Sequence, residues 1–580
     1  MRNYKQHIKK NWYCFLLGPL FMTLEACGEF ILPFINANII DKGAANGDIP
    51  FIIEIGIYMV LIAVAMLITG VLGAFFAVRG STRMAAGVRM DVFDKIQTFS
   101  FSDIDRFSTG SLITRTTNDI TQIQSFTQTM LRGFFRSPIM LIGALIMSFS
   151  LNPDIAWVIL IVVPILALAT FLIIKTASPR YTAMQHQLDT LNNGIGESIT
   201  NIKVIKSFVR EEHEKEKFAN INTALMDKSI SALKMMILMQ PISALAVNVT
   251  TLIVVWASGR QIMVGGMEIG TLTAFITYLS QVLTALNFLA NIFLQGTRAA
   301  ASHRRISQVL STTPDISDSS AEHKEHSIDS GSVEFKNVSF RYFKDTKAPV
   351  LDDINIKINS GELVGIIGST GSGKTTLISL IPRLYDADCG EVLVDGINVK
   401  DLSIKELRDK VAVVLQKNTL FSGTVAENLR WGNENATDEE LVKVCKIAQA
   451  DSFINSFPDG YDTEIGQGGG NLSGGQKQRL CIARALLKKP QIMILDDSTS
   501  AVDTATDASI RRAFRDKLPG ITKLIIAQRI TSVMDADKII VMDKGRIVDF
   551  GTHAELLSSS ATYQEIYYSQ KDREEAGANE

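Results

Sequence analysis

The chain has 580 residues and a formal net charge of −2. A chain of this length exceeds what one hydrophobic core usually organises, so at least two domains are expected. The near-neutral charge gives no reason to expect nucleic acid as a partner. The five cysteines show no CxxC or CxxxC spacing, which argues against a zinc site and a disulfide framework. The mean hydropathy of +0.17, with 20% charged residues, indicates one strongly apolar part and one ordinary soluble part.

Long apolar segments fill the first half of the chain and stop near residue 305. A membrane span requires about 20 largely apolar residues. Six segments meet this condition, at about 12–40, 52–78, 131–152, 155–176, 236–257 and 271–296. The first apolar run is long and has no small-residue cleavage site after it, so it does not resemble a signal peptide.

The distribution of Lys and Arg predicts the orientation of these spans. The short connections 41–48, 151–154 and 259–270 are poor in Lys and Arg, whereas the long stretches 79–130 and 177–235 are rich in them. We therefore expect both termini in the cytoplasm. The long inner stretches show helical periodicity. They predict helices that continue beyond the bilayer and end in turns near 101–110 and 210–218.

A polar, Ser- and Asp-rich segment separates the apolar half from a soluble half and is typical of a linker. The predicted organisation is a transmembrane domain over 1–310, a linker over 311–331, a soluble domain over 332–570 and a disordered acidic tail over 571–580.

A glycine-rich turn follows the apolar strand LVGII and precedes a helix. It matches the pattern G-x-x-x-x-G-K-[ST], whose backbone N–H groups surround phosphates while the helix N-terminus adds its dipole. In this pattern Lys374 reaches the β- and γ-phosphates of ATP, and the Thr375 hydroxyl coordinates Mg²⁺. The predicted phosphate-binding residues are Gly368, Ser369, Thr370, Gly371, Ser372, Gly373, Lys374, Thr375 and Thr376.

A second buried strand, IMIL at 492–495, ends in two adjacent carboxylates. In ATPases with such a phosphate loop, the first acid holds the Mg²⁺ through water. We assign this role to Asp496. The next residue, Asp497, has the position of the general base that faces the attacking water.

The soluble half resembles the nucleotide-binding domain of ABC transporters, and the resemblance extends over the entire chain. NLSGGQKQR (471–479) is similar to the ABC signature motif, and SAVD (500–503) to the D-loop. Tyr342 stands where the family stacks an aromatic ring on adenine. Gln416 matches the Q-loop glutamine. The resemblance implies that this residue takes part in metal binding and catalysis. The chain thus resembles a half-transporter of the multidrug and lipid exporter type. The expected fold is a helical six-span membrane domain fused to an α/β P-loop nucleotide-binding domain.

The resemblance implies a dimer and a mechanism. Each ATP would lie between the Walker motifs of one chain and the signature motif of the other. Closure of the two nucleotide-binding domains would move two coupling helices and turn the membrane cavity outward. The signature residues that would contact ATP on the partner are Ser473, Gly474, Gly475 and Gln476.

Two residues depart from the family pattern. Asp497 replaces the usual Glu, and Gln528, in IIAQR, replaces the switch His. The shorter carboxylate withdraws its oxygen by roughly 1 Å, a misplacement that can cost about 10²-fold in rate. Gln528 is neutral and cannot titrate. We therefore expect slow hydrolysis at this site and a partner subunit that carries Glu and His, as in heterodimeric exporters. A homodimer with two slow sites is the alternative.

Glu25 and Glu29 share one helical face within the first span. Carboxylates in a span are costly and face a cavity or a partner. They predict contact with a cationic, amphipathic substrate. The alternative is that they line water near the outer end of the span, or pair with a residue of the partner subunit, without contact to cargo. A lipid flippase and an ATP-gated channel remain alternatives, whereas the six spans argue against a soluble ABC ATPase. The resemblance implies a bacterial cell membrane, with lipids as neighbours.

Overall fold

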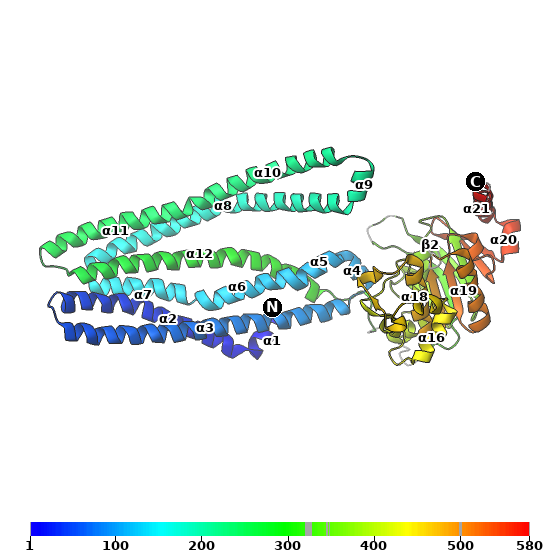
Figure 1. Ribbon diagram of the computed structural model, residues 1–580, viewed down its shortest axis with the longest axis horizontal. Helices are drawn as coiled ribbons and strands as arrows, with labels where there is room; N and C mark the ends of the chain where they lie inside the picture. Colours follow the sequence, from blue (N-terminus) through cyan, green and yellow to red (C-terminus); the bar gives the residue numbers. More distant parts are fainter. Residues whose placement is uncertain (1, 319–326, 344–345, 347, 498–501, 579–580) are drawn as a thin grey trace. The chain divides into compact units, whose positions relative to one another are not determined.

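The computed structural model describes residues 2–318, 327–343, 346, 348–497 and 502–578 (Figure 1). The chain divides into two compact units. The first comprises Met1–Gln97 and Gly110–Thr312, and the second comprises Thr98–Thr109 and Thr313–Glu580. The predicted linker contains residues 319–326, and the predicted D-loop contains residues 500 and 501, which lie outside the described part.

Helices pass through all six predicted spans of the first unit. These helices are α2 (Trp12–Asn38), α3 (Ile49–Gln97), α6 (Ile120–Gly133) followed by α7 (Arg136–Leu151), α8 (Pro153–Thr200), α11 (Met239–Met263) and α12 (Ile269–Ser311). Among the described residues, four stretches are long and apolar enough to cross a membrane, namely Trp12–Ala44, Ile49–Gln97, Thr109–Leu151 and Ile269–Ser311. Shorter elements of this unit are α1 (Arg2–Lys10), η1 (Ile39–Ala44), α5 (Thr109–Thr114) and η2 (Arg115–Asp119).

Small residues allow α2 and α3 to lie closely side by side (Figure 1). A Cβ atom on Gly73 would meet the Met22 side chain at 2.7 Å, and one on Gly80 would meet the Cys14 Cβ at 2.9 Å. Close backbone approach at small residues is the usual way that membrane helices gain packing energy.

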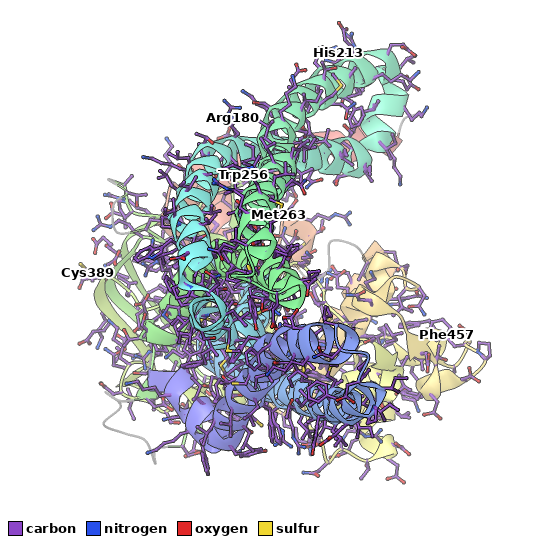
Figure 2. The ribbon with its side chains drawn as sticks, turned by 90° about the vertical axis from the view of Figure 1, so that its left-hand side faces the viewer. Arg180, His213, Trp256, Met263, Cys389 and Phe457 are labelled. Carbon is purple, nitrogen blue, oxygen red and sulfur yellow. The ribbon has the colours of Figure 1, made fainter. Side chains whose placement is uncertain are left out.

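The two turns expected beyond the membrane spans compare differently with the prediction. The first is the short helix α4 (Phe101–Phe107), which lies within the predicted segment 101–110 and begins with a capping box between Ser100 and Asp103. The second is the helix α9 (Ile202–Ser207), so the prediction of a turn at 210–218 was wrong. The acidic residues Glu211, Glu212 and Glu214 instead occupy the first turn of α10 (Glu211–Ile237), where they complement the helix dipole. Figure 2 shows His213 near this end of the α8–α10 pair.

The second unit is built around a six-stranded sheet of order β12-β11-β3-β10-β9-β6. Its strands are β3 (Leu363–Gly368), β6 (Val411–Val414), β9 (Ile492–Asp496), β10 (Thr522–Ile526), β11 (Lys538–Asp543) and the antiparallel edge strand β12 (Arg546–Gly551). Strands β3 and β9 both pair in parallel with β10. The phosphate-loop strand and the Asp496 strand therefore end at the same edge of the sheet, where ligands of such sheets bind.

A second sheet has the order β2-β1-β4-β5 and shares a core with one face of the large sheet. Its strands are β1 (Val333–Phe340), β2 (Leu351–Ile358), β4 (Cys389–Val394) and β5 (Ile397–Asn398), and a small third sheet pairs β7 (Gly423–Thr424) with β8 (Glu464–Ile465). The helices are α13 (Lys374–Leu380), α14 (Ile404–Lys410), α15 (Val425–Arg430), α16 (Asp438–Ile447), α17 (Asp451–Ile454), α18 (Gly474–Leu487), α19 (Thr504–Lys517), α20 (His553–Ser559) and α21 (Ala561–Ala578), with the 3-10 turns η4 (Gly460–Asp462), η5 (Gln467–Gly469) and η6 (Ile530–Ser532).

The C-terminal tail differs from its prediction. Residues 571–580 were expected to be disordered, but the structure continues α21 to Ala578. The helix is anchored at its start, because Tyr563 is fully buried and its hydroxyl bonds to Nδ1 of His553 at 2.7 Å. A buried first turn allows the polar residues that follow to propagate the helix.

Candidate functional site

The glycine-rich turn between β3 and α13 has the backbone that its sequence requires. Gly368, Gly371 and Gly373 have φ values of 151°, 84° and 95°. A Cβ atom on Gly368 would lie 2.1 Å from the Met542 carbonyl oxygen. Only glycine accommodates both the positive φ and this approach. The turn leads directly into the first residue of α13, which is Lys374.

The cation and the hydroxyl of this turn face the carboxyl end of β9. Lys374 Nζ donates to the carbonyl oxygens of Gly368 and Ser369, each at 2.8 Å. Thr375 Oγ1 donates to Oδ1 of Asp496 at 3.1 Å. The structure thus brings together a cation, a hydroxyl and a carboxylate from the ends of two strands that are distant in sequence.

Burial governs the ionisation of these groups. It lowers the pKa of Lys374 and raises the pKa of Asp496, with the neighbouring Asp497 carboxylate raising the latter further. Each of these charged groups therefore lacks the solvation it would have in water and gains from a compensating ligand charge. A nucleotide phosphate opposite Lys374 and a cation opposite Asp496 would supply these charges.

Asp497 has a constrained backbone. Its φ is 48°, in the left-handed region, where Asp is tolerated better than most residues. Its N–H donates to the Ile526 carbonyl at 3.0 Å, and its carbonyl accepts a bond from Gln478 Nε2 at 3.3 Å. The position from which the carboxylate extends is therefore held by β10 and α18.

The Asp497 carboxylate is engaged by two glutamines. Gln528 Nε2 donates to its Oδ2 at 2.7 Å. Burial raises the pKa of Asp497, whereas hydrogen bonds from Gln416 and Gln528 counteract that rise. The structure thus places the Q-loop residue, the acid and the residue at the switch position in direct contact.

These residues line one cavity of about 740 Å³. Its lining includes the predicted phosphate-loop residues other than Ser372, together with Gln416, Asp496, Asp497 and Gln528. It also includes five residues of α21 that the sequence analysis missed, namely Thr562, Glu565, Ile566, Ser569 and Gln570. Their spacing places them on one helical face. That spacing was readable in the sequence, but a polar face alone resembles a solvated surface.

The predicted adenine-stacking residue lies beside the phosphate loop. The Tyr342 hydroxyl bonds to Thr376 Oγ1 at 3.0 Å. Its ring meets that of Tyr385 edge-on, with the centroids 5.1 Å apart. Since Tyr342 is 38% exposed, part of its ring is free to cover a ligand.

The signature residues are arranged as a helix start. Ser473 caps α18 in a capping box with Gln476, whose Oε1 accepts from the Ser473 N–H at 2.9 Å. Gly474 and Gly475 form the first turn of this helix. None of these four is among the described residues that line the 740 Å³ cavity. The structure therefore separates the signature from the Walker residues of the same chain.

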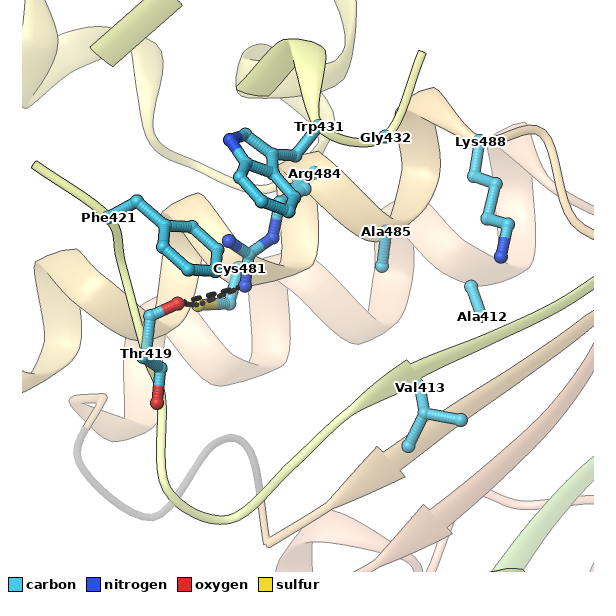
Figure 3. A pocket seen from close by; sticks show the side chains of 10 residues that line it. All are labelled: Ala412, Val413, Thr419, Phe421, Trp431, Gly432, Cys481, Arg484, Ala485 and Lys488. Atoms are coloured by element: carbon cyan, nitrogen blue, oxygen red, sulfur yellow. Dashed lines mark hydrogen bonds between the residues drawn. The ribbon is translucent and has the colours of Figure 1, made fainter. Parts of the chain in front are cut away.

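A different groove of the second unit carries two cations and two stacked aromatic rings (Figure 3). Phe421 and Trp431 stack with centroids 4.0 Å apart, while Arg484 donates to the Thr419 carbonyl at 3.0 Å. The described lining contains Arg484 and Lys488 but no carboxylate. It therefore lacks the carboxylate that usually helps to hold Mg²⁺ at a Mg·ATP site.

The two carboxylates in the first span share one cation of the same chain. Arg136 bonds to Oε1 of Glu29, and its Nε lies 3.9 Å from Oε2 of Glu25. Glu25, Arg136 and Arg132 line a membrane-domain cavity of about 580 Å³. The cation that pairs with these carboxylates belongs to this chain, whereas the sequence analysis considered pairing with a partner subunit, and Glu25 also lines a cavity.

Comparison with known families identifies both parts of the chain. The family described as "ABC transporter transmembrane region" matches residues 15–286, and the family described as "ABC transporter" matches residues 351–500. The ABC transporter ATP-binding protein YfiB of Bacillus subtilis is 38% identical over 561 residues, covering 96% of each chain. The chain belongs to the ABC transporter family. It is an ATP-binding, multi-pass membrane protein and a subunit of an ATP-driven exporter.

Two further relatives carry names that mention cargo. The fatty acid ABC transporter ATP-binding/permease protein of Mycobacterium bovis is 34% identical, over 83% of this chain and 75% of that one. YgaD of Bacillus subtilis, named as a multidrug export ATP-binding/permease protein, is 33% identical over 85% of each. A solved structure of a bacterial Atm1-family ABC exporter shares the fold, with a TM-score of 0.79, 24% identity and 98% coverage of both chains.

Proposed function

We propose that this chain is the slow-site subunit of a heterodimeric exporter of small amphipathic molecules. The observation that carries the proposal is the hydrogen bond between Gln528 and Asp497. The general base of hydrolysis must reach a water at the γ-phosphate. Here the carboxylate is one methylene short and is bound to a neutral amide instead of a titratable imidazole.

The site has the donors that a Mg²⁺ ion prefers. Mg²⁺ takes hard oxygen ligands and is usually held by one or two protein groups together with the phosphates. The Thr375 hydroxyl and the Asp496 carboxylate already lie within 3.1 Å of each other, and the Gln416 amide lines the same cavity. These residues fit the ion. When bound, Mg²⁺ neutralises charge on the β- and γ-phosphates.

The residues of this chain then bind ATP but hydrolyse it only slowly. Lys374 exchanges its bonds to two loop carbonyls for the nucleotide phosphates, and the loop N–H groups surround them. Asp497, held by Gln528, withdraws from the attacking water, so that ATP is retained for longer than a turnover at the partner's site. The retained nucleotide keeps the two nucleotide-binding domains associated and biases the cycle.

The intact signature completes a competent site on a second subunit. Ser473 already presents a helix N-terminus, with the glycines at 474 and 475 behind it. Such a terminus attracts phosphate through its free N–H groups. A partner with Glu after its Walker Asp and His at its switch would hydrolyse ATP against this signature. A homodimer with two slow sites is the alternative.

Contacts inside the second unit provide a route from the site to the first coupling helix. The Tyr385 hydroxyl donates to Oδ2 of Asp105 in α4 at 2.8 Å, and the Phe101 and Tyr385 ring centroids lie 6.1 Å apart. Tyr385 also contacts Tyr342 at the nucleotide site. Movement of the nucleotide-binding domain therefore transmits to α4 through one side chain.

The lining of the membrane-domain cavity supports an amphipathic cargo. Its lining combines apolar side chains such as Leu67 and Phe288 with polar ones such as Gln128 and Asn291. Glu25 remains our candidate contact, whereas Glu29 acts through Arg136. Lipid translocation is the second candidate function, favoured by the relative named for fatty acids.

The decisive experiment measures Mg-ATP hydrolysis by the purified chain in lipid nanodiscs, with the mass of the particle. We expect ATP binding with negligible turnover, and a rate that appears when a second ABC half-transporter subunit is added. A brisk rate from a stable homodimer, abolished by Asp497→Asn, would contradict the slow-site assignment. Stimulation by dyes rather than by lipids distinguishes drug efflux from lipid translocation.

A further inference from the structure

The C-terminal helix α21 forms one wall of the nucleotide cavity. Thr562, Glu565, Ile566, Ser569 and Gln570 recur at the spacing of a single helical face and line the cavity together with the phosphate loop. The helix is anchored in the domain core along the edge of this face, where Tyr563 is fully buried. The helix is therefore held against the site and not merely appended to the domain.

One side chain of this helix bonds to the backbone on both sides of Arg529. Gln570 Nε2 donates to the Gln528 carbonyl at 2.8 Å, and Gln570 Oε1 accepts from the Ile530 N–H at 2.9 Å. The orientation of the amide follows from this pattern, because a flip would place N–H against N–H and oxygen against oxygen. The Ile530 N–H opens the 3-10 turn η6, so Gln570 also satisfies a donor at a helix start.

The clamped backbone is the one from which the switch side chain extends. Gln528 reaches from it to Asp497, with Nε2 2.7 Å from Oδ2. A continuous hydrogen-bonded path therefore runs from α21 through Gln528 to the carboxylate at the base position. A backbone shift of a fraction of an ångström at Gln528 would break the hydrogen bond between Gln528 and Asp497.

We propose that Gln570 is a positioning residue for ATP hydrolysis, through which the C-terminal helix sets the place of Gln528 relative to Asp497 and the γ-phosphate. This inference rests on the proposed function, since it concerns the same nucleotide site. Displacement of α21, by a partner subunit or by truncation, releases the switch segment and changes the rate at this site. The helix thus makes hydrolysis dependent on the C-terminus of the chain.

The test uses the full-length transporter in nanodiscs, loaded with γ-labelled ATP, and follows single-turnover phosphate release at this chain's site. Gln570→Ala removes both hydrogen bonds, and we expect an at least fivefold change in the rate constant with ATP affinity within twofold of wild type. Gln564→Ala is the matched control, because Gln564 lies on the same helix and its amide donates to the Leu557 carbonyl at 2.8 Å, away from the switch segment. It should leave the rate within twofold.

Two readouts separate positioning from a general loss of structure. Hydrogen–deuterium exchange of the peptide over 527–532 should rise in Gln570→Ala and not in Gln564→Ala, because only the former frees the Ile530 N–H. Gln570→Glu keeps an acceptor for that N–H but opposes the Gln528 carbonyl with an oxygen. Its rate relative to wild type at the same pH should recover only as the pH falls towards about 4, near the ordinary pKa of Glu, where the acid becomes a donor.

The outcomes separate this inference from the function on which it depends. Unchanged rate and unchanged exchange in Gln570→Ala would overturn the positioning role while leaving the transporter assignment intact. A wild-type chain that does not bind ATP would instead overturn the proposed function. In a third outcome, Gln570→Ala changes the rate, lowers ATP affinity by the same factor and raises exchange across the whole domain. This outcome would show that Gln570 has only a structural role and would also reject the inference.

Discussion

Gln528 donates from Nε2 to Oδ2 of Asp497 over 2.7 Å, so the two residues that depart from the ABC catalytic pattern contact each other directly. An amide that donates to a carboxylate compensates part of the cost of burying that charge. The same bond directs the carboxylate toward the switch segment. The two departures therefore form one structural unit.

Restoring the family's residues should accelerate hydrolysis at this site. Asp497→Glu combined with Gln528→His returns the missing methylene and the titratable ring, and we expect a gain of about 10²-fold in single-turnover phosphate release. The single Asp497→Glu variant should give a smaller gain in rate, because Gln528 still holds the carboxylate. The control is the same pair with Asp496→Asn added, which removes the metal acid. A double variant as slow as wild type would show that another residue limits the step.

The buried Asp497 predicts a pH-dependent change in stability. Burial raises its pKa in the folded protein above the usual 3.8. Ionisation of Asp497 at neutral pH therefore lowers the free energy of unfolding, and this loss disappears as the pH falls below the unfolded-state pKa. Asp497→Asn should raise the nucleotide-free melting temperature at pH 7, because it removes the charge that burial disfavours.

The gain from Asp497→Asn should disappear as the pH falls from neutral through the folded-state pKa of Asp497 and below its unfolded-state value. Thermal scans of the nucleotide-free protein over this range measure it. Asp459→Asn, at an exposed carboxylate, is the matched control and should leave the melting temperature unchanged at every pH. A gain that stays constant as the pH falls would mean that ionisation of Asp497 is not its origin.

The Thr375 hydroxyl should account for metal-dependent binding. Thr375→Val removes the oxygen that bonds to Asp496 and keeps the side-chain shape. We expect the affinity for ATP with Mg²⁺ to fall about tenfold, the loss of one hydrogen bond or ligand to a charged group. The affinity with EDTA should change little. Fluorescent-nucleotide titrations measure both, and an equal loss in the two conditions would contradict the metal role.

The shared arginine in the membrane domain should be required for stability. Arg136→Ala leaves Glu25 and Glu29 without their cation, and carboxylates without a partner are costly within a membrane span. Thermal unfolding in nanodiscs should show a large loss for Arg136→Ala that Glu29→Gln partly reverses. Arg132→Ala is the control, because no ion pair involving Arg132 is found among the described residues. Equal losses in both arginine variants would exclude a specific pairing role.

The contact between Tyr385 and α4 should affect coupling more than hydrolysis. Tyr385→Phe retains the ring contacts with Phe101 and Tyr342 but removes the hydrogen bond to Asp105. We expect basal ATPase activity within twofold of wild type and a severalfold loss of substrate stimulation in nanodiscs. Tyr461→Phe removes an equivalent bond to Asp451, of the same 2.8 Å length, remote from α4. If both variants lose stimulation equally, the Tyr385 contact has no special role in coupling.

The amino-acid sequence by itself determined the features that depend on short stretches of chain. A run of apolar residues is sufficient to predict a span, and the spacing of Gly368, Gly373 and Lys374 is sufficient to predict a phosphate loop, because both depend on local backbone geometry and side-chain type. Asp496 and Asp497 were identifiable for the same reason, as they end an apolar strand.

Only the tertiary structure decided which distant side chains meet. Gln528 and Asp497 are 31 residues apart, Gln570 and Gln528 are 42 apart, and Arg136 and Glu29 are 107 apart. No periodicity encodes such contacts, because they arise when separate helices and strands pack against a common core. The helix α21 illustrates the point, since the sequence analysis assigned no role to it, whereas in the structure five of its residues line the nucleotide cavity.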